Sequence, residues 1–217
     1  MRSLPRLALV AALALSSTAL AQRGSPLSVF GGSPLPTGSS VLHAQFGWPG
    51  ISATFLTGAT QKASFGGRFT FNYGLEGQVG GVLLGLKFQG LVRLGLIDTG
   101  RVNFGIDFAP GFAMYFPNAG GAGAYTELGV ALPVSFVLGI PLGDTLAFHA
   151  AVELPMLVTF TGYSTFYVPI YVGGGLEYAL DKNLFLTLSL QTGPMIDVRI
   201  NRPAYGLEGL FGLAFRL

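Results

Sequence analysis

Polar and apolar side chains alternate along most of this chain, from about residue 63 to the C-terminus. In the segment 84–94, apolar residues occupy positions 84, 86, 88, 92 and 94, whereas Lys87, Gln89 and Arg93 have the opposite parity. Successive side chains of a β-strand point to opposite faces of a sheet, so this period of two predicts strands with one apolar and one polar face. The chain is therefore expected to be an all-β protein.

The alternation does not by itself say which face is outside, because a soluble barrel of the lipocalin type carries the same pattern inverted. The expected strands are much longer than the about five or six residues typical of globular proteins. Only 10% of the residues are charged and 50% are hydrophobic, whereas soluble domains contain about 25% charged residues. These features predict an antiparallel up-and-down transmembrane β-barrel, apolar outside and polar inside.

The first 21 residues have the features of a cleaved secretory signal peptide. Arg2 and Arg6 supply the basic start, residues 7–15 the apolar stretch, and Ala19-Leu20-Ala21 a small-x-small cleavage site. Removal of the two arginines leaves ten basic and ten acidic residues out of twelve and ten, so charge gives no reason to expect nucleic acid as a partner. The absence of cysteine excludes disulfides and thiolate metal sites and fits a protein of the Gram-negative envelope.

Three regions are expected: the signal peptide 1–21, an irregular lead-in 22–40 with one short strand near 27–30, and the barrel 41–217. The expected strands are 41–57, 63–74, 80–97, 101–116, 125–140, 145–160, 165–180, 183–197 and 205–217. Short and longer connections alternate, as periplasmic turns and outer loops do in outer-membrane barrels. The count is ten strands, either because 27–31 adds one or because 41–48 and 51–57 form a hairpin about Pro49-Gly50; eight strands is the alternative.

Strand parity also predicts which polar residues face the lumen. The ionisable members of this lumen-facing set are Arg68, Lys87, Arg93, Asp107, Glu127, His149, Glu153, Glu177, Glu208 and Arg216. Arg or Lys on the lipid side would cost about 2–4 kcal/mol at mid-membrane. A barrel of eight to ten strands is nearly filled by its side chains, and unpaired buried charges are costly, so these groups are expected to pair and close the lumen. A narrow porin-like pore that selects a solute is the alternative.

Aromatic residues gather near the ends of the expected strands, on the side of the longer loops, as in the interface girdles of membrane barrels. They are Tyr73, Tyr115, Phe116, Tyr125, Phe160, Tyr163, Phe166 and Tyr205.

Five prolines fall on five consecutive expected strands at a similar height above the short turns: Pro110, Pro133, Pro155, Pro169 and Pro194. Proline removes a hydrogen bond from the sheet and belongs at edges or bulges. This belt predicts bulges that shape the barrel, with a lateral opening for lipid or another apolar molecule as the functional hypothesis.

Residues that could carry catalysis are scarce. His149 and Glu153 share the inner face, but four residues along one strand span about 13 Å, too far for a direct bond. His43, the second histidine, lies in the first strand, and neither histidine belongs to a nucleophile–base–acid pattern or a metal motif. A non-catalytic protein without cofactor is expected, and the sequence names no ligand.

The signal peptide, the alternating strands, the unequal connections and the closing strand 205–217 resemble those of small bacterial outer-membrane barrels of the OmpA, OmpX and OmpW kind. The resemblance covers 41–217 and implies location in the bacterial outer membrane, contact with its lipid, and insertion by the barrel assembly machinery. Members of this group usually end in an aromatic residue, whereas this chain ends in Leu217 with Phe215 two residues before it. The function implied is envelope structure or surface interaction, with a narrow pore or a lateral port for small or apolar molecules as the alternative.

Overall fold

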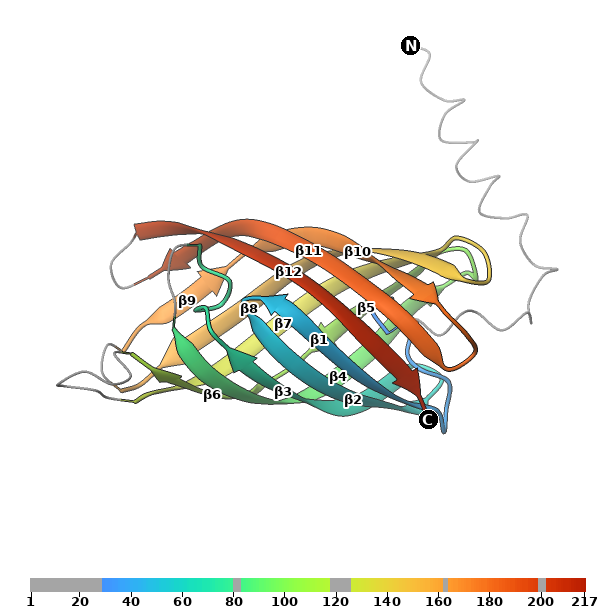
Figure 1. Cartoon of the computed structure of the whole chain (residues 1–217), viewed down its shortest axis with the longest axis horizontal. Coiled ribbons are helices and arrows are strands. Elements are labelled where there is room, and N and C mark those ends of the chain that lie inside the picture. Colours follow the sequence, from blue (N-terminus) through green and yellow to red (C-terminus); the bar gives the residue numbers. More distant parts are fainter. Residues whose placement is uncertain (1–28, 80–82, 118–125, 162–163, 199–201) are drawn as a thin grey trace, which may run out of the picture.

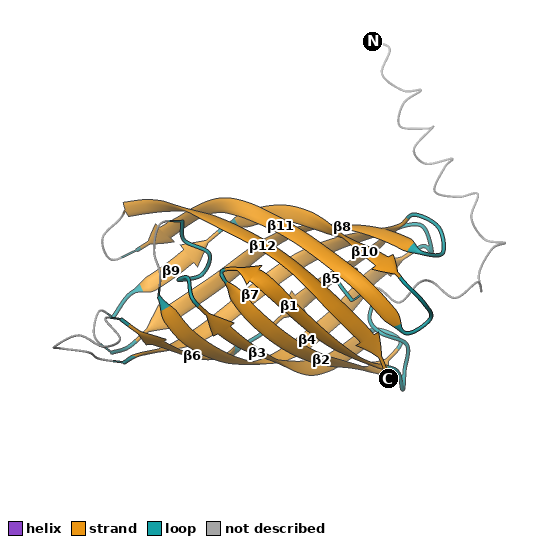
Figure 2. Ribbon diagram, in the orientation of Figure 1, coloured by secondary structure: helices purple, strands orange, loops and turns teal. Residues whose placement is uncertain are grey.

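The computed structural model describes residues 29–79, 83–117, 126–161, 164–198 and 202–217, so the expected signal peptide lies outside the described residues. Within them, strands are separated by turns and loops (Figure 2), and no helix is long and apolar enough to cross a membrane. The strands are β1 (Ser40–Trp48), β2 (Gly50–Thr60), β3 (Ala63–Asn72), β4 (Leu84–Asp98), β5 (Asn103–Phe108), β6 (Gly111–Phe116), β7 (Glu127–Pro141), β8 (Leu146–Thr159), β9 (Phe166–Pro169), β10 (Tyr171–Ala179), β11 (Leu184–Asp197) and β12 (Arg202–Arg216).

These strands form one antiparallel sheet that closes on itself, because β12 pairs with β1 as well as with β11 (Figure 1). β5 with β6, and β9 with β10, each act as one barrel strand interrupted at a proline, since both members of each pair contact the same neighbours. The described residues thus make a ten-stranded barrel, as predicted. Of the two routes to ten, the hairpin about Pro49 and Gly50 is correct, because β1 and β2 pair directly, whereas residues 29–33 form bends.

The two expected strands 101–116 and 165–180 were each predicted as continuous, and the structure divides both. The first is interrupted at Ala109 and Pro110 and the second at Ile170, which follows Pro169. A proline cannot donate to the sheet ladder, which explains both interruptions.

The outer surface of the barrel is apolar. Phe112, Leu190 and Phe88 are 72%, 59% and 57% exposed, and many other outward Leu, Val, Ile and Phe side chains accompany them. Soluble monomers rarely expose contiguous apolar surface on this scale. Among the described residues, the charged side chains in the middle of strands lie on the inner face.

We call the end of the barrel that carries the turns 61–62, 99–102, 142–145 and 180–183 the short-turn end, and the opposite end the long-loop end. The N-terminal segment that precedes β1 lies at the short-turn end (Figure 1). Its Val29 and Leu35 are 6% and 1% exposed and pack with Val41 and Phe185 of the barrel. The part of the lead-in that the structure describes, residues 29–39, contains no strand and contributes Val29 and Leu35 to the barrel core.

Candidate functional site

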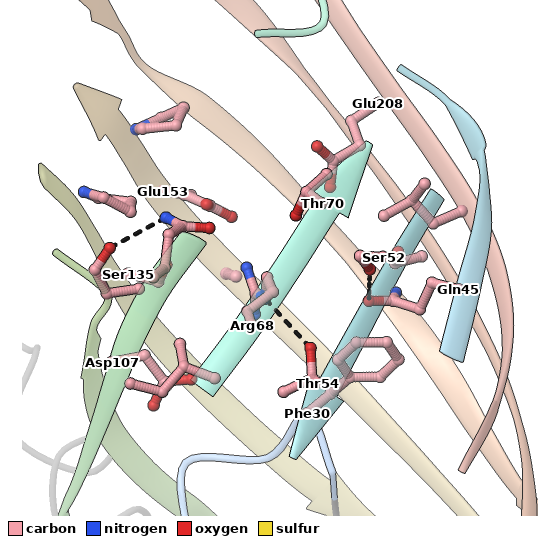
Figure 3. A pocket seen from close by; sticks show the side chains of 18 of the residues that line it. Phe30, Gln45, Ser52, Thr54, Arg68, Thr70, Asp107, Ser135, Glu153 and Glu208 are labelled. Atoms are coloured by element: carbon pink, nitrogen blue, oxygen red, sulfur yellow. Dashed lines mark hydrogen bonds between the residues drawn. The ribbon is translucent and has the colours of Figure 1, made fainter. Parts of the chain in front are cut away.

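A cavity of about 150 Å³ lies inside the barrel between the N-terminal segment and a loop at the long-loop end. Figure 3 shows the inner side chains that line it, from strands around the barrel wall. Polar side chains line about half of the wall, and valines, leucines, alanines, prolines, Phe30 and Met156 line most of the remainder. The cavity is the candidate site because seven of the ten ionisable residues that parity predicts inside the barrel line it.

The N-terminal segment covers the cavity at the short-turn end. The Glu177 carboxylate accepts hydrogen bonds from the backbone N–H groups of Val29 at 2.6 Å and Phe30 at 2.8 Å. The Phe30 ring lies 5.1 Å from the ring of His43 and 4.5 Å from that of His149, measured between centroids. The sequence placed Glu177 in the lumen, but it gave no sign that its partner would be the backbone of residues 29 and 30.

The same segment fits closely against the barrel wall through backbone. The N–H of Leu35 donates to Ser64 Oγ at 2.8 Å. A Cβ added to Gly32 would lie 2.6 Å from both Phe104 C and Val137 O, so only glycine fits there without a shift. The N-terminal segment therefore packs against the barrel wall so closely that an added methyl group at Gly32 would not fit without a shift.

At the long-loop end, the loop Tyr73–Val79 completes the barrel wall where the β1–β2 hairpin is short. The N–H groups of Tyr73 and Gly74 donate to Pro49 O at 2.9 and 3.1 Å, at the tip of the hairpin. On its other side the loop meets β12, where the Leu207 N–H donates to Gly77 O at 2.9 Å. A loop here replaces the outer parts of two strands between β3 and β12.

Glu76 anchors this loop from inside the barrel. It is 5% exposed and has a positive φ of 42°. Its carboxylate accepts hydrogen bonds from Lys87 Nζ at 2.9 and 3.1 Å and from the Tyr115 hydroxyl, and its backbone carbonyl accepts one from the Tyr171 hydroxyl. Asn72 Nδ2 donates to the Tyr115 oxygen at 3.0 Å. We call these residues the Glu76 network.

Sequence reasoning missed Glu76, which it left in a connecting loop, and it misplaced Tyr115. Tyr115 was expected in an interface girdle, but it is 1% exposed and lies in the interior. Strand parity could have predicted the position of Tyr115. It lies two residues from Ala113 in the same strand, so both side chains point to the same, inner face. Tyr205 and Phe160, by contrast, are 58% and 55% exposed.

A second ion pair joins two adjacent strands, closer to the short-turn end than the Glu76 network. Arg93 of β4 donates from Nε and Nη2 to the two carboxylate oxygens of Asp107 of β5, at 2.8 and 2.7 Å. Such a bidentate arrangement is among the stronger charge-assisted contacts. The two residues are also direct partners in the strand register.

Besides two histidines and a tyrosine, three further ionisable residues line the cavity without forming a salt bridge to any described residue: Arg68, Glu153 and Glu208. Arg68 Nε donates to Thr54 Oγ1 at 3.2 Å, and Glu153 Oε2 accepts from Gln191 Nε2 at 3.1 Å. Figure 3 shows these side chains converging on the same space.

The remaining acidic and basic members of the lumen-facing set, Glu127, Glu177 and Arg216, do not line the cavity. Glu127 is 7% exposed at the start of β7, and Arg216 is partly exposed at the end of β12. His149 lines the cavity and is 5% exposed.

The five prolines lie close to one row around the barrel wall. Pro133 and Pro155 are direct partners, and the pairs on either side place Pro169 opposite Pro155. β8 pairs with β10 only as far as Glu153 and with β9 only from Leu157, so the ladder is interrupted between them. We call this interruption the β8–β9 gap.

At Pro133 a side chain replaces the missing N–H donor, and the carbonyl groups of Pro110, Pro133 and Pro194 still accept backbone hydrogen bonds. The Ala109 carbonyl, which faces Pro133, accepts a hydrogen bond from Gln89 Nε2 at 2.9 Å. The Ala109 N–H donates to Pro133 O at 3.0 Å and the Ile170 N–H to Pro194 O at 2.9 Å, while Pro110 O accepts from the Gly90 N–H at 2.9 Å.

The described residues offer no arrangement of three or more His, Asp and Glu side chains suited to a metal ion. His43 Nε2 lies 2.9 Å from Thr187 Oγ1, and the His149 ring packs on Phe30. Neither histidine is hydrogen-bonded to a described carboxylate, so the orienting group of a nucleophile–base–acid arrangement is missing in this part of the chain.

Neither family models nor curated proteins match this sequence. Among solved structures, the chain is similar to the KdgM porin, alone and in complex with disordered oligogalacturonate, each with a TM-score of 0.33 and 8% identity over 82% of this chain and 98% of that chain. It is also similar to Ail, the attachment invasion locus protein of Yersinia pestis, with a TM-score of 0.27 and 10% identity over 84% of this chain and 100% of that chain.

Likenesses this distant carry no argument about function. The class of the protein follows from its own architecture: a small, closed, ten-stranded antiparallel β-barrel with an apolar exterior and a polar interior. This is the fold of the small outer-membrane barrels that the sequence resembles.

Proposed function

We propose that this chain is an integral protein of the bacterial outer membrane that performs no catalysis and serves envelope structure or surface interaction. In this proposal the lumen is closed to a continuous flow of ions, because a chain segment covers the polar cavity at each end. The observation that carries the proposal is the pair of chain segments, Val29–Leu35 and Tyr73–Val79, that cover opposite ends of one cavity.

Location in the membrane is supported by the outer surface. Exposed aromatic and aliphatic side chains surround the barrel, and the charged groups of mid-strand positions lie inside or in the core. Reversing that arrangement would cost about 2–4 kcal/mol for each Arg or Lys at mid-membrane. The predicted signal peptide provides export, and the predicted assembly partner is the barrel assembly machinery, with lipid as the surrounding medium.

Two measurements test this proposal. Carbonate washing of envelopes should leave the protein in the membrane fraction, and its release as a soluble species would contradict location in the bilayer. Purified protein in planar bilayers should give no unit conductance steps. Discrete ion-sized steps from the unmodified chain would instead favour the narrow pore.

The β8–β9 gap supports a second candidate, a lateral port for apolar molecules. Pro133, Pro155 and Met156 line the cavity at this place, so a parting of β8 from β9 would connect the cavity with lipid. Hydrogen–deuterium exchange tests the port: fast exchange is expected at amides flanking Pro155 and Pro169. Complete protection of those amides, equal to that of β11–β12, would exclude it.

A further inference from the structure

We propose that the cavity binds a small organic cation, namely a protonated amine with a compact apolar body, between Glu153 and Glu208. The inference deepens the proposed function, because it requires the closed lumen to be a binding chamber as well as a scaffold. It rests on the charges, the hydrogen-bonding groups and the shape of the cavity wall.

The charges of the wall do not balance. Its ionisable residues, besides two histidines and a tyrosine, are Arg68, Lys87, Arg93, Glu76, Asp107, Glu153 and Glu208. Two salt bridges join Lys87 to Glu76 and Arg93 to Asp107. One guanidinium and two carboxylates are then left, so the unpaired part of the wall carries an excess negative charge. Leaving such a charge without a partner away from bulk water is costly.

The two carboxylates flank one glutamine. Gln191 of β11 is the register partner of Glu208 on β12, and its Nε2 donates to Glu153 Oε2 of β8 at 3.1 Å. Gln191 Oε1 is buried and lacks a hydrogen-bond donor among the described residues. Glu208 likewise has no hydrogen bond to any described residue. This corner therefore offers several acceptors and few donors, which is the complement of an ammonium group with three N–H donors.

An apolar wall adjoins these acceptors. Pro155 lies two residues from Glu153 on the same face of β8, and Pro133 is the register partner of Pro155. Met156 and Ala151 also line the cavity. A cavity of about 150 Å³ suits a small molecule with a compact body and leaves no room for a long acyl chain.

Other classes of ligand fit less well. An anion would meet two carboxylates and a single unpaired arginine, which is already bonded to Thr54 through Nε. A metal ion would need a cluster of ligands that the described residues do not form. Water can satisfy the hydrogen bonds without offsetting the excess charge, and a proton taken up by one carboxylate would offset the charge but supply only one donor. The protonated amine meets both requirements.

The test uses 4-fluorobenzylamine as a probe with the purified mature protein in detergent micelles, followed by fluorine NMR. Its matched control ligand is 4-fluorobenzyl alcohol, which has nearly the same shape without the charge. We expect saturable binding of the amine, with an affinity at least about tenfold above that of the alcohol, because charge-assisted hydrogen bonds are worth roughly twice neutral ones.

The variants Glu153→Gln and Glu208→Gln should each weaken binding of the amine, and the double variant should lose at least about tenfold in affinity. Asp144→Asn removes a carboxylate from an exposed turn outside the cavity and should leave affinity unchanged. Circular dichroism checks that each variant retains its β-barrel.

Equal affinity for amine and alcohol, non-saturable partition into micelles, or unchanged binding by a folded double variant would each overturn the inference. The bilayer measurement keeps this failure separate from failure of the proposed function. If the protein gives no conductance steps and does not bind the amine, only the proposed ligand is refuted. If the unmodified chain conducts ions, the closed lumen is refuted.

Discussion

The two ends of the barrel are covered by different physical means. At the short-turn end, the N-terminal segment is held by apolar burial of Val29 and Leu35 and by backbone hydrogen bonds to Glu177. At the long-loop end, the Glu76 network holds the loop through an ion pair and tyrosine hydroxyls. Truncating a buried apolar side chain costs only its share of the burial, whereas losing one member of a buried ion pair also leaves an uncompensated charge. The long-loop end should therefore be the more sensitive to single substitutions.

The largest effect is expected from Glu76→Ala, which leaves Lys87 without its partner inside the barrel. Removing one member of a buried pair costs about 3–5 kcal/mol in free energy of unfolding. Trp48, the one tryptophan of the chain, donates to Gly77 O at 3.2 Å and should report the change by its fluorescence. Denaturant titration of this emission measures the loss, and the double variant Glu76→Ala with Lys87→Met should recover most of it. A loss below about 1 kcal/mol, as for surface ion pairs, would contradict the claim that a buried ion pair holds the long-loop end.

Leu35→Ala tests the opposite end. Truncation of a leucine that is 1% exposed should lower the free energy of unfolding by about 2–4 kcal/mol. The native fluorescence of Trp48 should stay the same, because Trp48 contacts the loop at the other end. Leu180→Ala, at a residue that is 49% exposed beyond the end of β10, is the matched control. A shift of native Trp48 emission in Leu35→Ala would show that the two ends are coupled.

Gly32→Ala should displace the N-terminal segment through crowding. The added methyl group would meet backbone atoms on two strands, at a cost of about 1–3 kcal/mol. Because the chain has no cysteine, maleimide labelling of a Val29→Cys background can follow the segment, and Gly32→Ala should accelerate it. Gly90→Ala, where the new Cβ would lie 4.0 Å from Pro110 O, provides the control. Unchanged labelling would mean that the wall adapts to the methyl group.

The smallest effect is expected from Ser64→Ala. This change removes the acceptor of the Leu35 N–H, a buried hydrogen bond, and should cost about 1 kcal/mol. Ser33→Ala, which loses a bond to Asp98 at the exposed rim, should cost less than about 0.5 kcal/mol. Denaturant titrations of both variants sharpen the comparison, and a reversed order would indicate that the rim holds the segment.

The barrel itself could be predicted from the sequence because a period of two is a local signal. Segments such as 84–94 show their two faces without reference to the rest of the chain. The hairpin at Pro49 and Gly50 stayed one of two options, since local sequence permits a bend there and only pairing with β12 on one side and β3 on the other decides it.

The coverings of the cavity could not be predicted, because their partners are distant in sequence. Val29 is bound by Glu177, 148 residues away, and the Glu76 carbonyl by Tyr171, 95 residues away. Parity said that Glu177 and Lys87 face inward, but it did not identify what they would meet there. The lumen-facing role of the charged set and the lateral opening at the prolines stay predictions.

The short β1–β2 hairpin has a mechanical consequence. β12 pairs with β1 only from Gly209 to Arg216, and beyond that its neighbour is the loop Tyr73–Val79, with one isolated bridge between Gln78 and Gly206. The seam that joins the first and last strands is thus a continuous ladder over half its length and a loop contact over the other half. Under lateral tension in the membrane, β12 should therefore separate from its neighbour first at that loop, where few backbone hydrogen bonds hold the two together.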